Sequence, residues 1–183
     1  MSIDEQYDAA CWLIERYDNL RSLVSNRASI IVSADALLLA GITFLLDHLI
    51  GLGNTMAGIE RTILFAVVGL VILLLSISLF YAVSAIAFVW TTGRKATGFS
   101  NEPVILFFST RETLNILPTT ELFAERFKST TKEQMTDYAL AELLLVSRIH
   151  QARYGAFRWS LRFLQMAVPP FLVAILLTLL QMI

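Results

Sequence analysis

Residues Thr62–Thr92, TILFAVVGLVILLLSISLFYAVSAIAFVWTT, include no charged side chain in thirty-one positions. As an α-helix rising about 1.5 Å per residue it would be about 46 Å long, whereas the hydrocarbon core of a bilayer is about 30 Å thick. We therefore predict a membrane span that either tilts or projects beyond the lipid at its C-terminal end. Trp90 is predicted to anchor that end at the membrane interface. Gly93, followed by Arg94 and Lys95, is predicted to end the helix.

Two further runs match a membrane span in length. Ala28–Leu46 carries one charge, Asp35, and Phe163–Ile183 carries none. Pro169 and Pro170 lie in the first half of the latter and are predicted to kink or restart that helix, because proline lacks an amide donor. Apolar residues make up 56% of the 183-residue chain, against about 45–50% in soluble domains. The sequence thus predicts an all-α membrane protein that contacts the lipid bilayer.

The polar segments predict further helices. Ser2 and Glu5 fit a capping box that opens an amphipathic helix. Its apolar stripe either packs on the same chain or forms a coiled-coil seam between subunits. Val104–Phe108 is predicted to be a short extended run. Thr119–Glu121 is predicted to start a helix, and Thr130 or Thr131 is predicted to cap a long helix. The expected organisation is an N-terminal cytoplasmic helix at 1–27, a first span at 28–50, an external turn at 51–61, a second span at 62–92, a cytoplasmic helical region at 93–162 and a third span at 163–183.

Basic residues set the expected orientation. Thirteen of the 14 lysines and arginines fall on one side of the three spans, and only Arg61 falls on the other. Because basic residues collect on the cytoplasmic side, we expect a multi-pass protein of the bacterial inner membrane with a cytoplasmic N-terminus. Any sensing then belongs to the cytoplasmic helices.

Composition and motifs disfavour several classes of function. The net charge of −1 gives no support to nucleic-acid binding. Cys11 is the single cysteine, and no Cys/His cluster of metal-binding spacing is present. Catalytic sequence motifs are also absent, so we expect neither an enzyme nor a cofactor.

Asp35 is the most informative single residue. An ionised carboxylate facing lipid would cost about 2.5–3.5 kcal/mol or more, so Asp35 should face protein or water. Ser76, Ser78 and Tyr81 of the second span are candidates to line the same polar seam. Two interpretations stay open: a pore or inter-subunit contact, or a structural hydrogen bond or shallow carboxylate near the headgroups.

The basic residues also offer a candidate anion site, for instance for a nucleotide phosphate. Its members would be Arg94, Lys95, Arg111, Arg148 and Arg153. The alternative is that these cations only reflect the cytoplasmic location of this region.

Several stretches resemble the Pycsar effector family, small bacterial membrane proteins of anti-phage systems that signal with cyclic nucleotides. They are Asn26–Ala28 leading into Ala36–Leu39, Val104–Phe108, Thr119–Phe123, and Ile149–Arg162 with Arg153-Tyr154 and Leu161-Arg162. The resemblance implies an effector that a cyclic mononucleotide or a protein trigger switches on through its cytoplasmic helices. Three helices cannot enclose a wide pore, so the effector would act as a homo-oligomer that permeabilises or disrupts the inner membrane. The alternative is a non-channel scaffold or accessory subunit that anchors a cytoplasmic partner.

Overall fold

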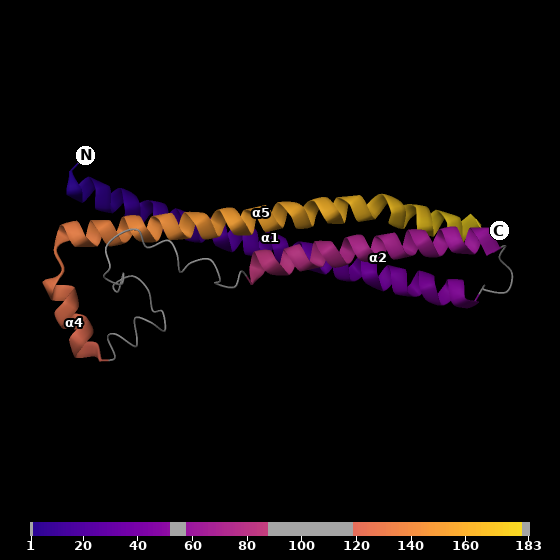
Figure 1. Ribbon diagram of the computed structural model, residues 1–183, viewed down its shortest axis with the longest axis horizontal. Coiled ribbons are helices and arrows are strands. Elements are labelled where there is room, and N and C mark those ends of the chain that lie inside the picture. Colours follow the sequence, from indigo (N-terminus) through magenta and orange to yellow (C-terminus); the bar gives the residue numbers. More distant parts are fainter. Residues whose placement is uncertain (1, 52–57, 88–118, 181–183) are drawn as a thin grey trace. The chain divides into compact units, whose positions relative to one another are not determined.

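The computed structural model describes residues 2–51, 58–87 and 119–180, and within them all regular structure is helical (Figure 1). The helices are α1 (Ile3–Gly51), α2 (Gly58–Ile86), α4 (Thr120–Ser129) and α5 (Lys132–Leu180). Three of them, α1, α2 and α5, are long and apolar enough to cross a membrane, which confirms the all-α, three-span prediction. The predicted run Val104–Phe108 and the anchor Trp90 lie outside the described residues.

The starts of α1 and α5 are capped by side chains that the sequence suggested. At α1 the Ser2 amide donates to Glu5 Oε2 at 2.8 Å, and the Glu5 amide donates to Ser2 Oγ at 3.3 Å. At α5 Thr131 and Gln134 form the same reciprocal pair, at 3.0 and 3.3 Å. Both capping boxes satisfy amides that the first helical turn leaves without a partner.

Two of the helices each join two segments that the sequence analysis predicted separately. α1 runs through both the predicted N-terminal helix and the first span, and α5 joins the predicted cytoplasmic helix to the third span. α5 also continues through Pro169 and Pro170, so of the two predicted alternatives the restart was wrong and the kink stays a prediction. Lipid offers no alternative partner for backbone groups, so the chain keeps its helix and loses only the hydrogen bonds that the two prolines cannot donate.

The described chain belongs to two compact units. The first contains Met1–Ser22 and Val89–Gln151, and the second contains Leu23–Phe88 and Ala152–Ile183. α1 and α5 each contribute residues to both units.

In the second unit three helices pack along seams with a repeat of three and four residues (Figure 1). The buried positions are Val24, Ala28, Ile31, Asp35, Ile42 and Leu45 on α1, Leu64, Val68, Val71, Leu75, Ser78, Ala82 and Ala85 on α2, and Ser160, Ala167, Ala174 and Thr178 on α5. This repeat is the one that lets helices cross at a small angle with side chains interdigitated. The small residues Ser160, Ala167 and Ala174 of α5, spaced by seven, allow the helices to approach closely.

A close approach in the second unit fixes how α1 and α5 face each other. A methyl group added to Gly41 would lie 3.1 Å from Cζ of Phe171. The Phe171 ring therefore covers the bare backbone of α1 at this glycine, and a larger side chain would have to displace it.

The outside of the second unit is apolar. Its large exposed side chains include Leu37 and Phe44 on α1, Leu73 and Phe80 on α2, and Leu172 and Leu176 on α5, all more than half exposed. An apolar surface around an apolar seam is the pattern of helices whose solvent is lipid. The protein is thus a multi-pass membrane protein.

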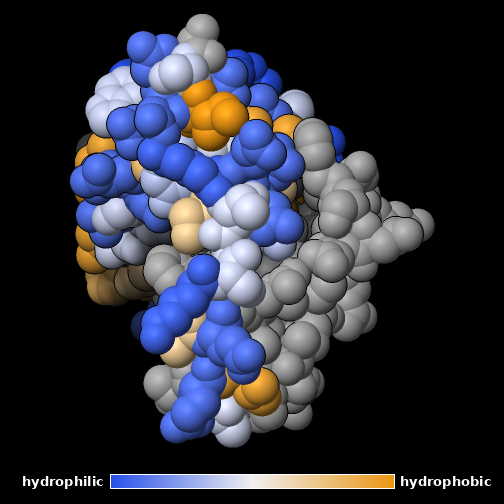
Figure 2. Space-filling view, turned by 90° about the vertical axis from the view of Figure 1, so that its left-hand side faces the viewer, coloured by the Kyte–Doolittle hydropathy of each residue, from blue (hydrophilic) through white to orange (hydrophobic). Residues whose placement is uncertain are grey.

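The first unit has a different surface. The face seen in Figure 2, which includes the starts of α1 and α5, is largely hydrophilic. Lys132 of α5 forms an ion pair with Asp4 of α1. Ala10, Ala139 and Val146 are buried in this unit, together with the polar residues Thr136 and Glu142.

Candidate functional site

A polar cluster joins the three helices of the second unit. Ser78 of α2 lies with its Oγ 3.0 Å from Asp35 Oδ2 of α1 and 3.1 Å from the Ser160 carbonyl oxygen of α5. The Ser160 hydroxyl lies 3.4 Å from the same Oγ. All three residues are fully buried. We call Asp35, Ser78 and Ser160 the polar knot.

The knot has fewer hydrogen-bond donors than acceptors. The Ser78 hydroxyl has one hydrogen and can donate to only one of its two acceptors at a time. Asp35 Oδ1 is buried and has no hydrogen-bond partner within the described residues. Removing a donor from a buried acceptor costs about 1–3 kcal/mol. The knot therefore stabilises the arrangement of the three helices in which Ser78 lies within hydrogen-bonding distance of both Asp35 and Ser160.

Only part of the predicted polar seam assembles. Ser76 is exposed and donates to the Ile72 carbonyl of its own helix at 2.8 Å. Tyr81 contributes through its ring, which stacks on Phe163 and Trp159 with centroid distances of 5.9 and 6.5 Å. Of the predicted seam residues, the knot therefore contains Asp35 and Ser78.

Ser160 was missed because it precedes the charge-free run that starts at Phe163. The sequence did contain a signal for it. Ser160, Ala167 and Ala174 are small and spaced by seven, which is the repeat of the buried face of α5.

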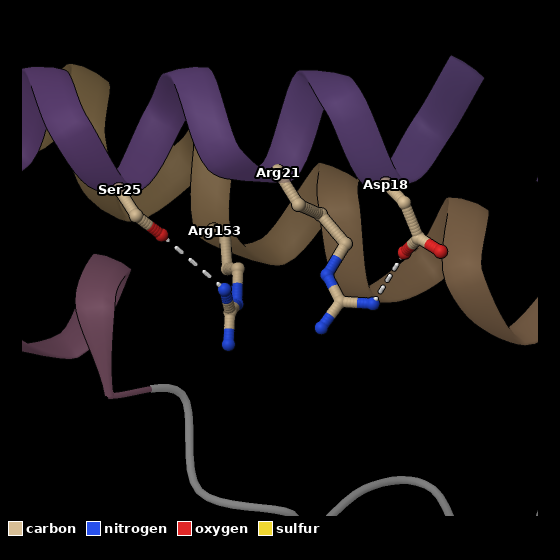
Figure 3. A network of polar contacts seen from close by, with 4 residues as sticks. All are labelled: Asp18, Arg21, Ser25 and Arg153. Carbon is tan, nitrogen blue, oxygen red and sulfur yellow. Dashed lines mark hydrogen bonds and ion pairs between the residues drawn. The ribbon is translucent and has the colours of Figure 1, made fainter. Parts of the chain in front are cut away.

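A second buried carboxyl group lies in the first unit. Glu142 of α5 is 7% exposed, and its Oε2 has no hydrogen-bond partner within the described residues. The pKa of Glu142 is raised to about 7, chiefly by burial and also by the nearby charge of Asp18, whereas Arg21 lowers it. Arg21 is itself engaged, because its Nη1 donates to Asp18 Oδ1 at 2.8 Å (Figure 3). Glu142 was missed as well, although it stands between the buried positions Ala139 and Val146.

His150 packs on an aromatic ring of the same unit. Its ring centroid lies 5.6 Å from that of Tyr17, with the two planes inclined at 56°. Burial lowers the pKa of His150 below its ordinary value. This environment favours a neutral imidazole that contributes to helix packing.

Of the five residues of the candidate anion site, the structure describes Arg148 and Arg153. Arg148 is exposed, whereas Arg153 is half-buried and its Nη1 donates to Ser25 Oγ of α1 at 3.5 Å (Figure 3). Arg94, Lys95 and Arg111 lie outside the described residues. Across residues 2–51, 58–87 and 119–180, no group of three or more His, Cys, Asp or Glu could hold a metal ion.

Comparison with protein families gives one result that covers nearly the whole chain. The model of the Pycsar effector protein domain matches residues 12–180. Comparisons with the curated proteins and with the solved structures gave no match. The matched residues include the polar knot and nearly all of the three membrane-spanning helices. The chain therefore belongs to the Pycsar effector family, whose resemblance the sequence already indicated.

Proposed function

We propose that this anti-phage membrane effector oligomerises and permeabilises the bacterial inner membrane when a cyclic mononucleotide acts on its cytoplasmic region. The single observation that carries the proposal is the family match, which extends over all three apolar helices. The N-terminus is cytoplasmic in this account, and the effect on the membrane is physical and not enzymatic.

The shared helices support a route from trigger to membrane. α1 and α5 each contribute residues to both units, so the chain of each helix leads from the polar unit into an apolar one. A rearrangement of the first unit thus has two covalent connections to the spans. Coupling of this kind requires an element with two arrangements that the ligand distinguishes.

The packing of the second unit supports the need for several subunits. Its central positions are filled by side chains of the same chain, among them Leu64, Val71 and Leu75. Three helices packed on such a core do not surround water, so a conducting path must form between copies. Asp35 then acts inside each subunit, through Ser78, in setting how the three helices present themselves to neighbouring copies.

The trigger would bind through cations. Arg148 is exposed on α5 and supports a phosphate contact, and Arg94, Lys95, Arg111 and Arg153 are the other proposed members of the site. Arginine is well suited to this task because its planar guanidinium can donate two parallel hydrogen bonds to one phosphate.

The experiment measures membrane potential with a voltage-sensitive dye in cells that express the protein, with and without synthesis of a cyclic mononucleotide. We expect depolarisation and loss of viability only when both are present. In parallel, the mass of the detergent-solubilised protein should rise to that of a larger homo-oligomer on nucleotide addition. Unchanged potential and viability under both conditions would contradict the proposal. If expression of this protein is harmless and a different protein co-purifies with it, the scaffold alternative is favoured.

A further inference from the structure

The polar knot provides a depth marker in the second unit. Seventeen residues separate Arg61 from Ser78 along α2, which is about 26 Å of helix. Arg61 is an exposed cation that belongs at or beyond one boundary of the bilayer, whose core is about 30 Å thick. The opposite boundary therefore falls about one helical turn beyond Ser78. α5 agrees, because the twenty residues from Ser160 to Leu180 cover about 30 Å.

Two exposed arginines lie at this second boundary. Arg158 and Arg162 stand two residues before and two residues after Ser160 on α5, and both are exposed. At about 100° per residue each points about 160° away from Ser160, and the two share one face. Because Ser160 is buried and contacts Ser78 of α2, that shared face is turned away from this packing contact.

The surroundings of these arginines are those of a membrane interface. The Arg162 guanidinium lies 5.0 Å from the ring centroid of Trp159, which is half exposed. Tyr81 and Phe163 stack beside Trp159, and tryptophan and tyrosine are enriched at the headgroup level. Side chains of a helix lean toward its N-terminus, which for α5 is the direction of this boundary. Arg162 can therefore extend from apolar surroundings toward the headgroups.

We propose that Arg158 and Arg162, with Trp159 between them, bind the phosphate of an anionic phospholipid at this boundary. Neither arginine forms an ion pair with a carboxylate of the described residues, so both guanidinium groups can donate to an anion. A phosphate accepts parallel hydrogen bonds from such a fork, and anionic lipids add a favourable surface potential. The inference goes beyond the proposed function, since it requires neither a trigger nor a given orientation.

The test compares the full-length protein in nanodiscs of pure phosphatidylcholine with nanodiscs that contain one part in four of phosphatidylglycerol. Native mass spectrometry counts the lipids that stay bound, and thermal unfolding reports stability. We expect the wild type to retain phosphatidylglycerol and to unfold at a higher temperature in its presence. The double variant Arg158→Gln/Arg162→Gln should lose at least three-quarters of the retained lipid and most of the temperature shift.

Matched controls separate a site from general electrostatics. Arg16→Gln removes an exposed arginine of α1 in the first unit that also lies against a tryptophan ring, at 5.3 Å from the Trp12 centroid, and should retain as much lipid as the wild type. Equal unfolding temperatures in detergent show that the double variant folds. Equal lipid retention in the double variant and the wild type would overturn the proposal, and so would an equal loss of lipid in Arg16→Gln. A change in oligomer mass with lipid retention intact would assign the two arginines to a contact between copies instead.

Discussion

The hydrogen bond of Asp35 comes from the Ser78 hydroxyl, whose single hydrogen can instead be donated to the Ser160 carbonyl oxygen. Asp35 Oδ2 lies 3.0 Å from Ser78 Oγ, and Asp35 Oδ1 has no partner within the described residues. The sequence predicted that Asp35 would avoid lipid and named Ser78 as a neighbour. It could not distinguish Ser78 from Ser76, because both are serines of the same charge-free helix and only the packing decides which one faces α1.

The two serines provide a matched pair of variants. Ser78→Ala leaves a buried carboxyl group without its donor, so we expect a loss of about 1–3 kcal/mol in the free energy of unfolding. Ser76→Ala removes an exposed hydroxyl that bonds only to its own helix and should change stability by less than about 0.5 kcal/mol. Thermal unfolding in detergent measures both. Equal stability of the two variants would contradict the structural role of the knot.

Substitution of Asp35 itself tests its link to activity. Asp35→Ala should insert into the membrane at the wild-type level, since removal of a carboxyl group makes the span more apolar. Loss of the knot should nevertheless abolish permeabilisation or alter the mass of the oligomer. Membrane fractionation and the voltage-sensitive dye measure the two properties. Normal permeabilisation by this variant would limit Asp35 to a local hydrogen bond.

Glu142 gives the first unit a pH dependence of definite sign. Its pKa of about 7 in the folded protein lies above the ordinary value of 4.5, so between these values the folded state holds a proton that the unfolded state has released. Stability is therefore fully present below about pH 4.5 and falls as the pH rises toward 7, by up to about 1.4 kcal/mol per pH unit. Glu142→Gln should flatten this slope in chemical unfolding between pH 5 and 8.

A control variant isolates that carboxyl group. Glu133→Gln changes an exposed glutamate in the first turn of the same helix and should keep the wild-type slope. An unchanged slope in Glu142→Gln, or an equal change of slope in Glu133→Gln, would contradict this role of Glu142.

At the scale of the helices, the sequence predicted where they begin and which segments are apolar. Capping boxes are local, so Ser2 with Glu5 and Thr131 with Gln134 could be found from spacing alone. The continuity of α1 and α5 could not, because the change from a polar to an apolar surface looks like a boundary although the backbone continues. The restart predicted at Pro169 and Pro170 was wrong for a related reason, since the cost of a missing donor does not exceed the cost of an open backbone in lipid.

The contact of α1 with α5 is sensitive to side-chain size at Gly41. Gly41→Leu must displace the Phe171 ring, and we expect overpacking to cost about 1–3 kcal/mol of stability. Gly69→Leu is the matched control, because a side chain at that position of α2 meets open space. Truncation of the ring in Gly41→Leu/Phe171→Ala should restore part of the loss. Equal unfolding temperatures of the two leucine variants would show that this contact does not determine the packing of the spans.

At the scale of the whole molecule, composition alone predicted the class of protein, because 56% apolar residues exceed what a small core can bury. The proposed orientation rests on the distribution of basic residues, and the single cysteine makes it testable. A membrane-impermeant maleimide should label Cys11 in inside-out vesicles and not in spheroplasts. The reverse is expected for Asn54→Cys in a Cys11→Ser background. Labelling of Cys11 in intact spheroplasts would indicate the opposite topology, with the N-terminus outside.

The most direct test of the central claim, triggered permeabilisation, is dye release from liposomes that contain only the purified protein. Wild-type protein should release an entrapped fluorophore on addition of a cyclic mononucleotide and retain it otherwise. The Ser78→Ala variant, with its three spans no longer held by the knot, should release at an altered rate. Complete retention of the dye by wild-type liposomes across the common cyclic mononucleotides would contradict the claim.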